Sequence, residues 1–81
     1  MKSRIDQELH VVYPIDPESG YVIAEILYGC VQLVTLIYRR TFNDIECEIE
    51  PHVQPVIGIP VADFQRILII AQERLYYLNR K

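Results

Sequence analysis

The stretch YVIAEILYGCVQLVTLIY, residues 21–38, decides the fold of this chain of 81 residues. It is apolar almost throughout, and only Glu25, Gln32 and Thr35 in it are strongly hydrophilic. A segment of this composition is too apolar for a half-solvated surface element, so other apolar surface must cover it. A chain this short buries only about 60% of its unfolded surface, which leaves little to cover it with. We therefore expect self-association or a protein partner.

Two interpretations of this central stretch are open. As a hairpin, residues 21–28 and 31–40 are two strands joined by a turn at Gly29-Cys30, and their β-branched and aromatic residues are typical of strands. As a long helix over residues 17–41, Asp16 is the N-cap and Pro17 the first helical residue. We favour the hairpin because Gly29 would lie in the middle of the helix, where glycine is unfavourable.

The flanking segments predict more strands. Residues 9–13, LHVVY, form a short strand that ends before the turn residues of 16–20. Residues 44–50, DIECEIE, alternate apolar and acidic side chains, so Ile45, Cys47 and Ile49 are expected to point inward. Residues 56–59 are a candidate short edge strand between prolines.

The last segment predicts a helix over residues 60–81. Pro60 suits the first helical position, and Asp63 lies in the first turn, where the helix dipole favours a carboxylate. One apolar stripe at helical spacing faces the core; it consists of Phe64, Ile67, Leu68, Ala71, Leu75 and Leu78. More apolar residues lie off that stripe than a single sheet contact requires, which adds to the surface available for an interface.

The predicted fold is a single small α+β domain over residues 1–81. A small antiparallel meander of three to five strands precedes one C-terminal helix packed on one face, and residues 1–8 are expected to be frayed. Both faces of the hairpin carry apolar residues: strict alternation places Val31, Leu33 and Ile37 on the side opposite Val34 and Leu36. We expect the uncovered face to be an interface, and a homodimer is the simplest solution.

Charge limits the classes of partner that the protein can bind. The net charge is −3, and the few basic residues are scattered, so binding to a nucleic-acid backbone is disfavoured. The order of strands and helix is similar to that of single-stranded-DNA-binding coactivators of the four-strand-plus-helix type. Those proteins use a basic, aromatic-rich sheet, whereas the polar positions here are acidic, so that function does not carry over.

We expect a cytoplasmic protein, because residues 1–10 lack a secretory signal. We also expect no membrane span, because Glu25 interrupts the apolar stretch.

No motif for catalysis, cofactor binding or metal binding occurs in the sequence. The thiols of Cys30 and Cys47 are expected to be reduced and part-buried, and with His10 and His52 they lack the paired spacing of zinc sites. We therefore predict a protein that is not an enzyme and that has no cofactor.

Five residues are candidates for binding a partner. Glu46, Glu48 and Glu50 recur at period 2 on one strand face, which is either a solvated face or an acidic docking strip for a basic partner. Tyr76 and Tyr77 are adjacent in the helix and cannot both face one core, so one of them is expected at an interface. We expect a small, acidic interaction or regulatory module, such as an inhibitor, an immunity-type protein, an assembly factor or a phage or plasmid regulator.

The alternative function is a dimeric regulator that binds nucleic acid through basic residues of the C-terminal helix. Those residues are Arg66, Arg74, Arg80 and Lys81, together with Arg39 and Arg40.

Overall fold

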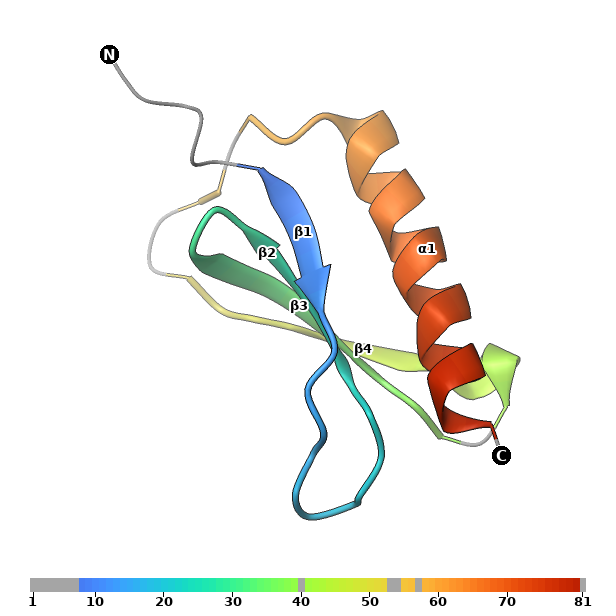
Figure 1. Cartoon of the computed structure of the whole chain (residues 1–81). Coiled ribbons are helices and arrows are strands. Elements are labelled where there is room, and N and C mark those ends of the chain that lie inside the picture. The colour runs from blue at the N-terminus through green and yellow to red at the C-terminus, as the bar shows by residue number, and fades with distance from the viewer. Residues whose placement is uncertain (1–7, 40, 53–54, 57, 81) are drawn as a thin grey trace.

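The computed structural model describes residues 8–39, 41–52, 55–56 and 58–80. It shows an α+β fold in which a four-stranded antiparallel meander is followed by one C-terminal helix packed against it, as predicted (Figure 1). In chain order the elements are β1 (Leu9–Val12), β2 (Ala24–Tyr28), β3 (Val31–Ile37), the short 3₁₀ turn η2 (Phe42–Asp44), β4 (Glu46–Ile49) and α1 (Val61–Asn79). The strand order is β1-β2-β3-β4, so β1 and β4 are the two edge strands.

The central stretch is a hairpin, and the alternative of a long helix over residues 17–41 is wrong. Strands β2 and β3 pair antiparallel, with the turn at Gly29-Cys30. Gly29 has a φ of 65°, which glycine adopts without the steric cost that other residues meet. Both strands are shorter than expected. Residues 13–23 instead form an irregular arm that extends the β1–β2 hairpin through a single bridge between Ile15 and Val22.

A bulge in β3 changes the faces that we expected for the hairpin. Ile26 pairs with Val34, but the next residue of β2, Leu27, pairs with Gln32, so Leu33 is an extra residue in β3. The side chains of Leu33 and Val34 are both buried. Strict alternation would have placed them on opposite faces; the bulge turns Leu33 to the helix side of the sheet.

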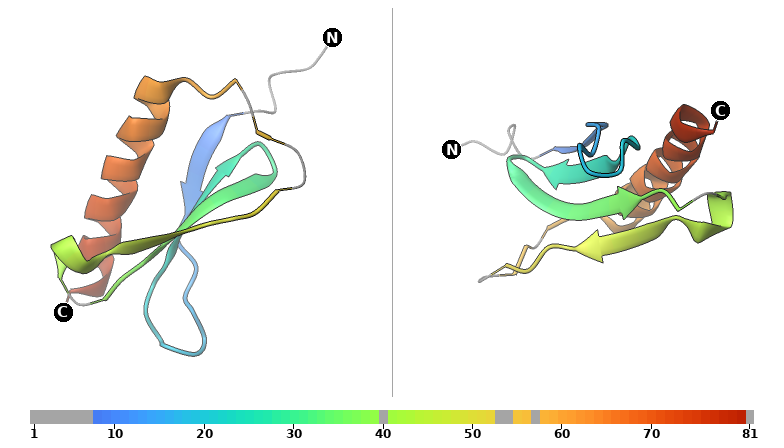
Figure 2. Two further views of the ribbon diagram at one scale, coloured as in Figure 1. Left: turned by 180° about the vertical axis from the view of Figure 1, so that it is seen from behind. Right: turned by 90° about the horizontal axis from the view of Figure 1, so that it is seen from below.

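Helix α1 packs against one face of the sheet (Figures 1 and 2). Of the described elements it contacts β1, β2, β3 and η2, and its backbone makes no close contact with β4. Its fully buried residues, Ala71 and Leu75, join Ala24 and Ile26 of β2 in the core. Pro60 takes the cap position, with extended backbone, rather than the first helical position that we predicted. One helix thus packs on three of the four strands.

The C-terminal end of α1 is tied to the hairpin arm by one side chain. Asn79 accepts a hydrogen bond at Oδ1 from the Val22 N–H at 2.9 Å, and its Nδ2 donates to the Val22 carbonyl at 2.8 Å. The amide therefore satisfies both peptide groups of Val22, as a neighbouring strand would. This link fixes the end of the helix on the β1–β2 side of the sheet.

Two other expectations concern segments outside regular structure. Val56, Gly58 and Ile59 have no strand structure, so the predicted edge strand over residues 56–59 is not formed by these three residues, and residue 57 lies outside the described residues. Fraying of residues 1–8 was predicted for a segment of which only Glu8 is described. No helix in the described part of the chain is long and apolar enough to cross a membrane.

Candidate partner-binding surface at strand β4

Edge strand β4 is exposed along its whole length. Its register places Ile49 opposite Val34 and Cys47 opposite Leu36, so these two side chains lie on the helix side of the sheet, whereas Glu46 and Glu48 point to the other face. The predicted alternation is therefore confirmed, but the predicted burial is wrong. Ile49 is 76% exposed and the Cys47 thiol is exposed, because α1 stops short of this strand.

The outer peptide groups of β4 are directed away from the sheet. The N–H of Glu50 donates to the carbonyl of Leu33 at 2.9 Å. In an antiparallel ladder, residues two apart face the same neighbour, so Glu48 and Glu46 bond to β3. Cys47 and Ile49 then direct their N–H and C=O groups outward, where an added strand can pair with them.

An apolar groove lies beside Ile49, on the helix side of the sheet. It holds about 410 Å³ and is closed by the first turn of α1 and by the segment after β4. Its lining comprises Leu33, Val34, Ile49, Glu50, His52, Pro55, Val56, Ile59, Val61 and Phe64. His52 holds the closing segment on β3, because its Nε2 donates to the carbonyl of Gln32 at 3.0 Å.

The three candidate glutamates differ in exposure. Glu46 and Glu48 are exposed on the open face of the sheet, whereas Glu50 follows β4, is half-buried and is among the residues that line the apolar groove. Arg39 forms an ion pair with Glu46 at 3.2 Å, and Arg40 lies outside the described residues.

The open face of the sheet is more polar than we predicted. One row across it runs Val12, Glu25, Thr35 and Glu48. Thr35 is buried and accepts a hydrogen bond at Oγ1 from the Gln32 side chain at 2.7 Å. The apolar residues of this face are therefore separated by carboxylates and amides, and the continuous apolar surface lies on the helix side.

The two candidate tyrosines lie apart from the groove. Both are in the C-terminal third of α1, whereas the groove uses the first turn of that helix. Tyr76 is half-buried, with its ring centroid 6.5 Å from that of Tyr38, and Tyr77 is exposed. The guanidinium of Arg80 lies over both rings, 5.1 Å from the Tyr77 centroid. The structure thus places the predicted site residues in two separate regions.

The chemical groups at this surface are peptide groups, carboxylates, a thiol and apolar side chains. The described residues contain no group of three His, Cys, Asp or Glu side chains that could hold a metal ion. Cys30 is free and exposed like Cys47, so the expected part-burial of the thiols is wrong. What β4 offers is an open peptide edge, two carboxylates on one side and apolar side chains on the other.

Sequence reasoning missed three residues that build the groove. Ile49 and Phe64 were both predicted to lie in the core. Val61 was predicted only to be part of the helix. The excess of apolar residues around the helix was the signal that more apolar surface exists than one sheet contact uses. In comparisons with known proteins, no family model matches the chain, and no curated protein or solved structure is significantly similar to it.

Proposed function

We propose that this protein is a small, non-enzymatic interaction module that binds an extended segment of another protein along β4. The observation that carries the proposal is the 76% exposure of Ile49, a residue that the register aligns with the buried Val34. An apolar row that continues past the reach of the helix is a row that another chain can cover. Addition of a strand to an open sheet edge is a recurrent mode of peptide recognition.

The chemistry of β4 specifies the segment that fits. Cross-strand neighbours on one face interact directly, so residues opposite Glu46 and Glu48 are favourable as Lys or Arg. Residues of the opposite parity lie beside Cys47 and Ile49 and are favourable as apolar side chains that enter the groove. The expected ligand is therefore a strand in which basic and apolar residues alternate.

The alternative function, binding of nucleic acid by the helix, has less support. Arg66 donates to Asp63 at 3.0 Å, and the guanidinium of Arg80 lies over the tyrosine rings. Arg74 lies beside Tyr13, where burial raises the pKa of the tyrosine hydroxyl and the guanidinium partly offsets that rise. The described basic residues of α1 are thus engaged with neighbouring side chains of the protein, and no observation favours phosphate contacts.

The proposal is tested by selecting peptides from a random display library on the immobilised protein. The selected sequences should alternate basic and apolar residues. Affinity measured by fluorescence polarisation should fall about tenfold or more in a Glu46→Lys/Glu48→Lys variant, because two attractive cross-strand pairs become repulsive. Peptides in which the basic residues are replaced by Glu should then bind the variant better than the wild type.

The matched control changes the same charge elsewhere. Glu18 and Glu73 are exposed and lie outside β4, so a Glu18→Lys/Glu73→Lys variant has the same net charge as the test variant. It should keep the affinity for the selected peptides within about twofold. A library that yields no binders, or binders that respond equally to the two double variants, would contradict the proposal.

A further inference from the structure

The two edges of the sheet differ in whether they can pair with themselves. Two β4 strands could pair antiparallel about a twofold axis, with both helices on the same side of the joint sheet. In the registers with the longest overlap, this axis passes at Cys47 or at Glu48. The first register sets Glu46 opposite the partner's Glu48, and the second sets Glu48 opposite itself. Like charges directly opposite are destabilising, so β4 is protected against a second copy of this chain.

Edge strand β1, LHVV, carries no such barrier. Its symmetric registers are centred on His10 or on Val11. They set Leu9 opposite the partner's Val11 or Tyr13, and Val12 opposite the partner's Glu8 or His10. Among the described residues 8–14, neither register sets a carboxylate opposite a carboxylate. Of the two edges, β1 is therefore the one that is compatible with self-pairing.

The backbone of β1 is oriented for this pairing. The carbonyl of Glu8 accepts from the Gly29 N–H at 3.0 Å, and the carbonyl of Pro14 accepts from the Ile23 N–H at 2.8 Å. Residues of that parity face β2, so Leu9 and Val11 direct their peptide groups to the open edge. Their side chains are half-buried and pack against the core.

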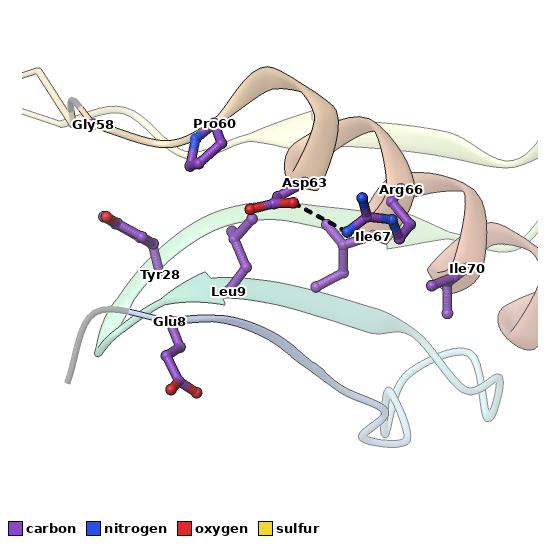
Figure 3. A pocket seen from close by; sticks show the side chains of 9 residues that line it. All are labelled: Glu8, Leu9, Tyr28, Gly58, Pro60, Asp63, Arg66, Ile67 and Ile70. Atoms are coloured by element: carbon purple, nitrogen blue, oxygen red, sulfur yellow. Dashed lines mark hydrogen bonds and ion pairs between the residues drawn. The ribbon is translucent and has the colours of Figure 1, made fainter. Parts of the chain in front are cut away.

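The flank of α1 above β1 exposes apolar side chains among charged ones. A hollow of about 590 Å³ lies between the helix and the start of β1, and Leu9, Ile67 and Ile70 are among the residues that line it (Figure 3). Ile70 is 49% exposed. The charges beside it are neutralised locally, because Arg66 donates to Asp63 at 3.0 Å. A second copy placed on the β1 edge would bring its own helix alongside this flank.

We infer that the protein forms a twofold homodimer through antiparallel pairing of its β1 strands, with the Ile70 flanks of the two helices packed against each other. The joint sheet has twice the four strands of one copy, and its two outer edges are both β4. Each dimer then offers two copies of the partner-binding edge. The inference goes beyond the proposed function and does not depend on it, because it uses the opposite edge.

The test begins with two neighbouring isoleucines of the helix. Ile70 lies on the β1 flank, whereas Ile69 is 56% exposed and absent from the lining of the hollow. The measurement is the mass in solution by sedimentation equilibrium over a wide range of protein concentrations. The wild type should be a dimer. Ile70→Lys should raise the dimer dissociation constant about tenfold or more, and Ile69→Lys should change it less than about twofold.

A second pair of variants removes one backbone hydrogen-bond donor from each edge strand. The Gly29-Cys30 junction permits chemical ligation of two synthetic halves, so an N-methyl group can be placed on the amide of Val11 or of Ile49. Both amides point away from the sheet, and neither change alters a side chain. Methylation of Val11 should dissociate the dimer, and methylation of Ile49 should not.

Two results would overturn the inference. One is a wild-type protein that is monomeric at every concentration. The other is a dimer that survives Ile70→Lys and N-methyl-Val11 but dissociates with N-methyl-Ile49. Failure of the proposed function is a separate outcome, because it would appear as peptide binding that N-methyl-Ile49 leaves unchanged, whatever the dimer dissociation constant is.

Discussion

Strands β1 and β4 are both edges of the same sheet, yet their surroundings are opposite. The helix-side residues of β1, Leu9 and Val11, are half-buried beneath α1, whereas Cys47 and Ile49 of β4 are exposed. The open-face residues of β1 are His10 and Val12, and those of β4 are two glutamates. The comparison shows how one helix on a four-stranded sheet produces two unlike edges. The edge covered by the helix, β1, carries no charged side chain, and the uncovered edge, β4, is apolar on the helix side and acidic on the open face.

The largest effect separates the two sides of one row of the sheet. Ile26 and Ile49 both pair with Val34, but Ile26 is 0% exposed and Ile49 is 76% exposed. Ile26→Ala should lower the free energy of unfolding by about 2–5 kcal/mol, because it leaves a cavity in the core. Ile49→Ala should lower it by less than about 0.5 kcal/mol. Urea unfolding followed by circular dichroism gives both values, and equal losses would mean that β4 is covered.

The next effect concerns the link that holds α1 on the β1–β2 side. Asn79→Ala removes the acceptor and the donor that satisfy the peptide groups of Val22, so we expect a loss of about 1–3 kcal/mol in the free energy of unfolding. Gln65→Ala, at an exposed position of the same helix, is the control and should cost less than about 0.5 kcal/mol. A neutral result for Asn79→Ala in urea unfolding would show that packing alone holds the end of the helix.

A smaller change should make the two edges alike. Glu46→Thr with Glu48→Thr removes like-charge pairs that each cost about 0.2–1 kcal/mol when β4 meets β4. Threonine also favours strands. The double variant should form larger assemblies than the wild type in a concentration-dependent manner, which light scattering coupled to size-exclusion chromatography would detect. Unchanged assembly would show that charge is not what protects this edge.

The smallest effect is expected at the ion pair of the acidic edge. Arg39 and Glu46 are both more than half exposed, so solvent screens their attraction. Arg39→Ala should change the free energy of unfolding by less than about 1 kcal/mol. It should at the same time strengthen binding of basic peptides, because Glu46 loses its internal cation. Weaker peptide binding in this variant would show that Arg39 itself contacts the partner.

The sequence predicted the order of elements because local patterns were consistent with it. The turn at Gly29-Cys30, the strand composition on either side and the alternation of residues 44–50 all specified an antiparallel meander followed by a helix. These signals depend on neighbouring residues, so they can be recognised without knowledge of the packing. The starts of β2 and of β4 were placed too early by two or three residues, as is common where a strand continues into an irregular arm or a 3₁₀ turn.

The site was only partly predictable, because its properties depend on how far the helix reaches. Alternation gives the face on which Ile49 lies, but its exposure depends on α1 lying over β1 to β3. The bulge at Leu33 has no strong local signal either, and it moved one large side chain from one face to the other. The alternation of residues 44–50 was enough to select Glu46 and Glu48 as candidates. The groove on the other side of β4 could be recognised only from the three-dimensional structure.

The two exposed thiols make it possible to measure the occupancy of β4 by chemical modification. Cys30 lies in the turn between β2 and β3, and Cys47 lies within β4, the edge that we propose binds a partner. A thiol reagent that modifies both at measurable rates would report on the occupancy of β4 through Cys47, with Cys30 as the reference within the same molecule. A bound segment should slow the reaction of Cys47 alone. Native, unlabelled protein can therefore be used to count occupied edges, one cysteine at a time.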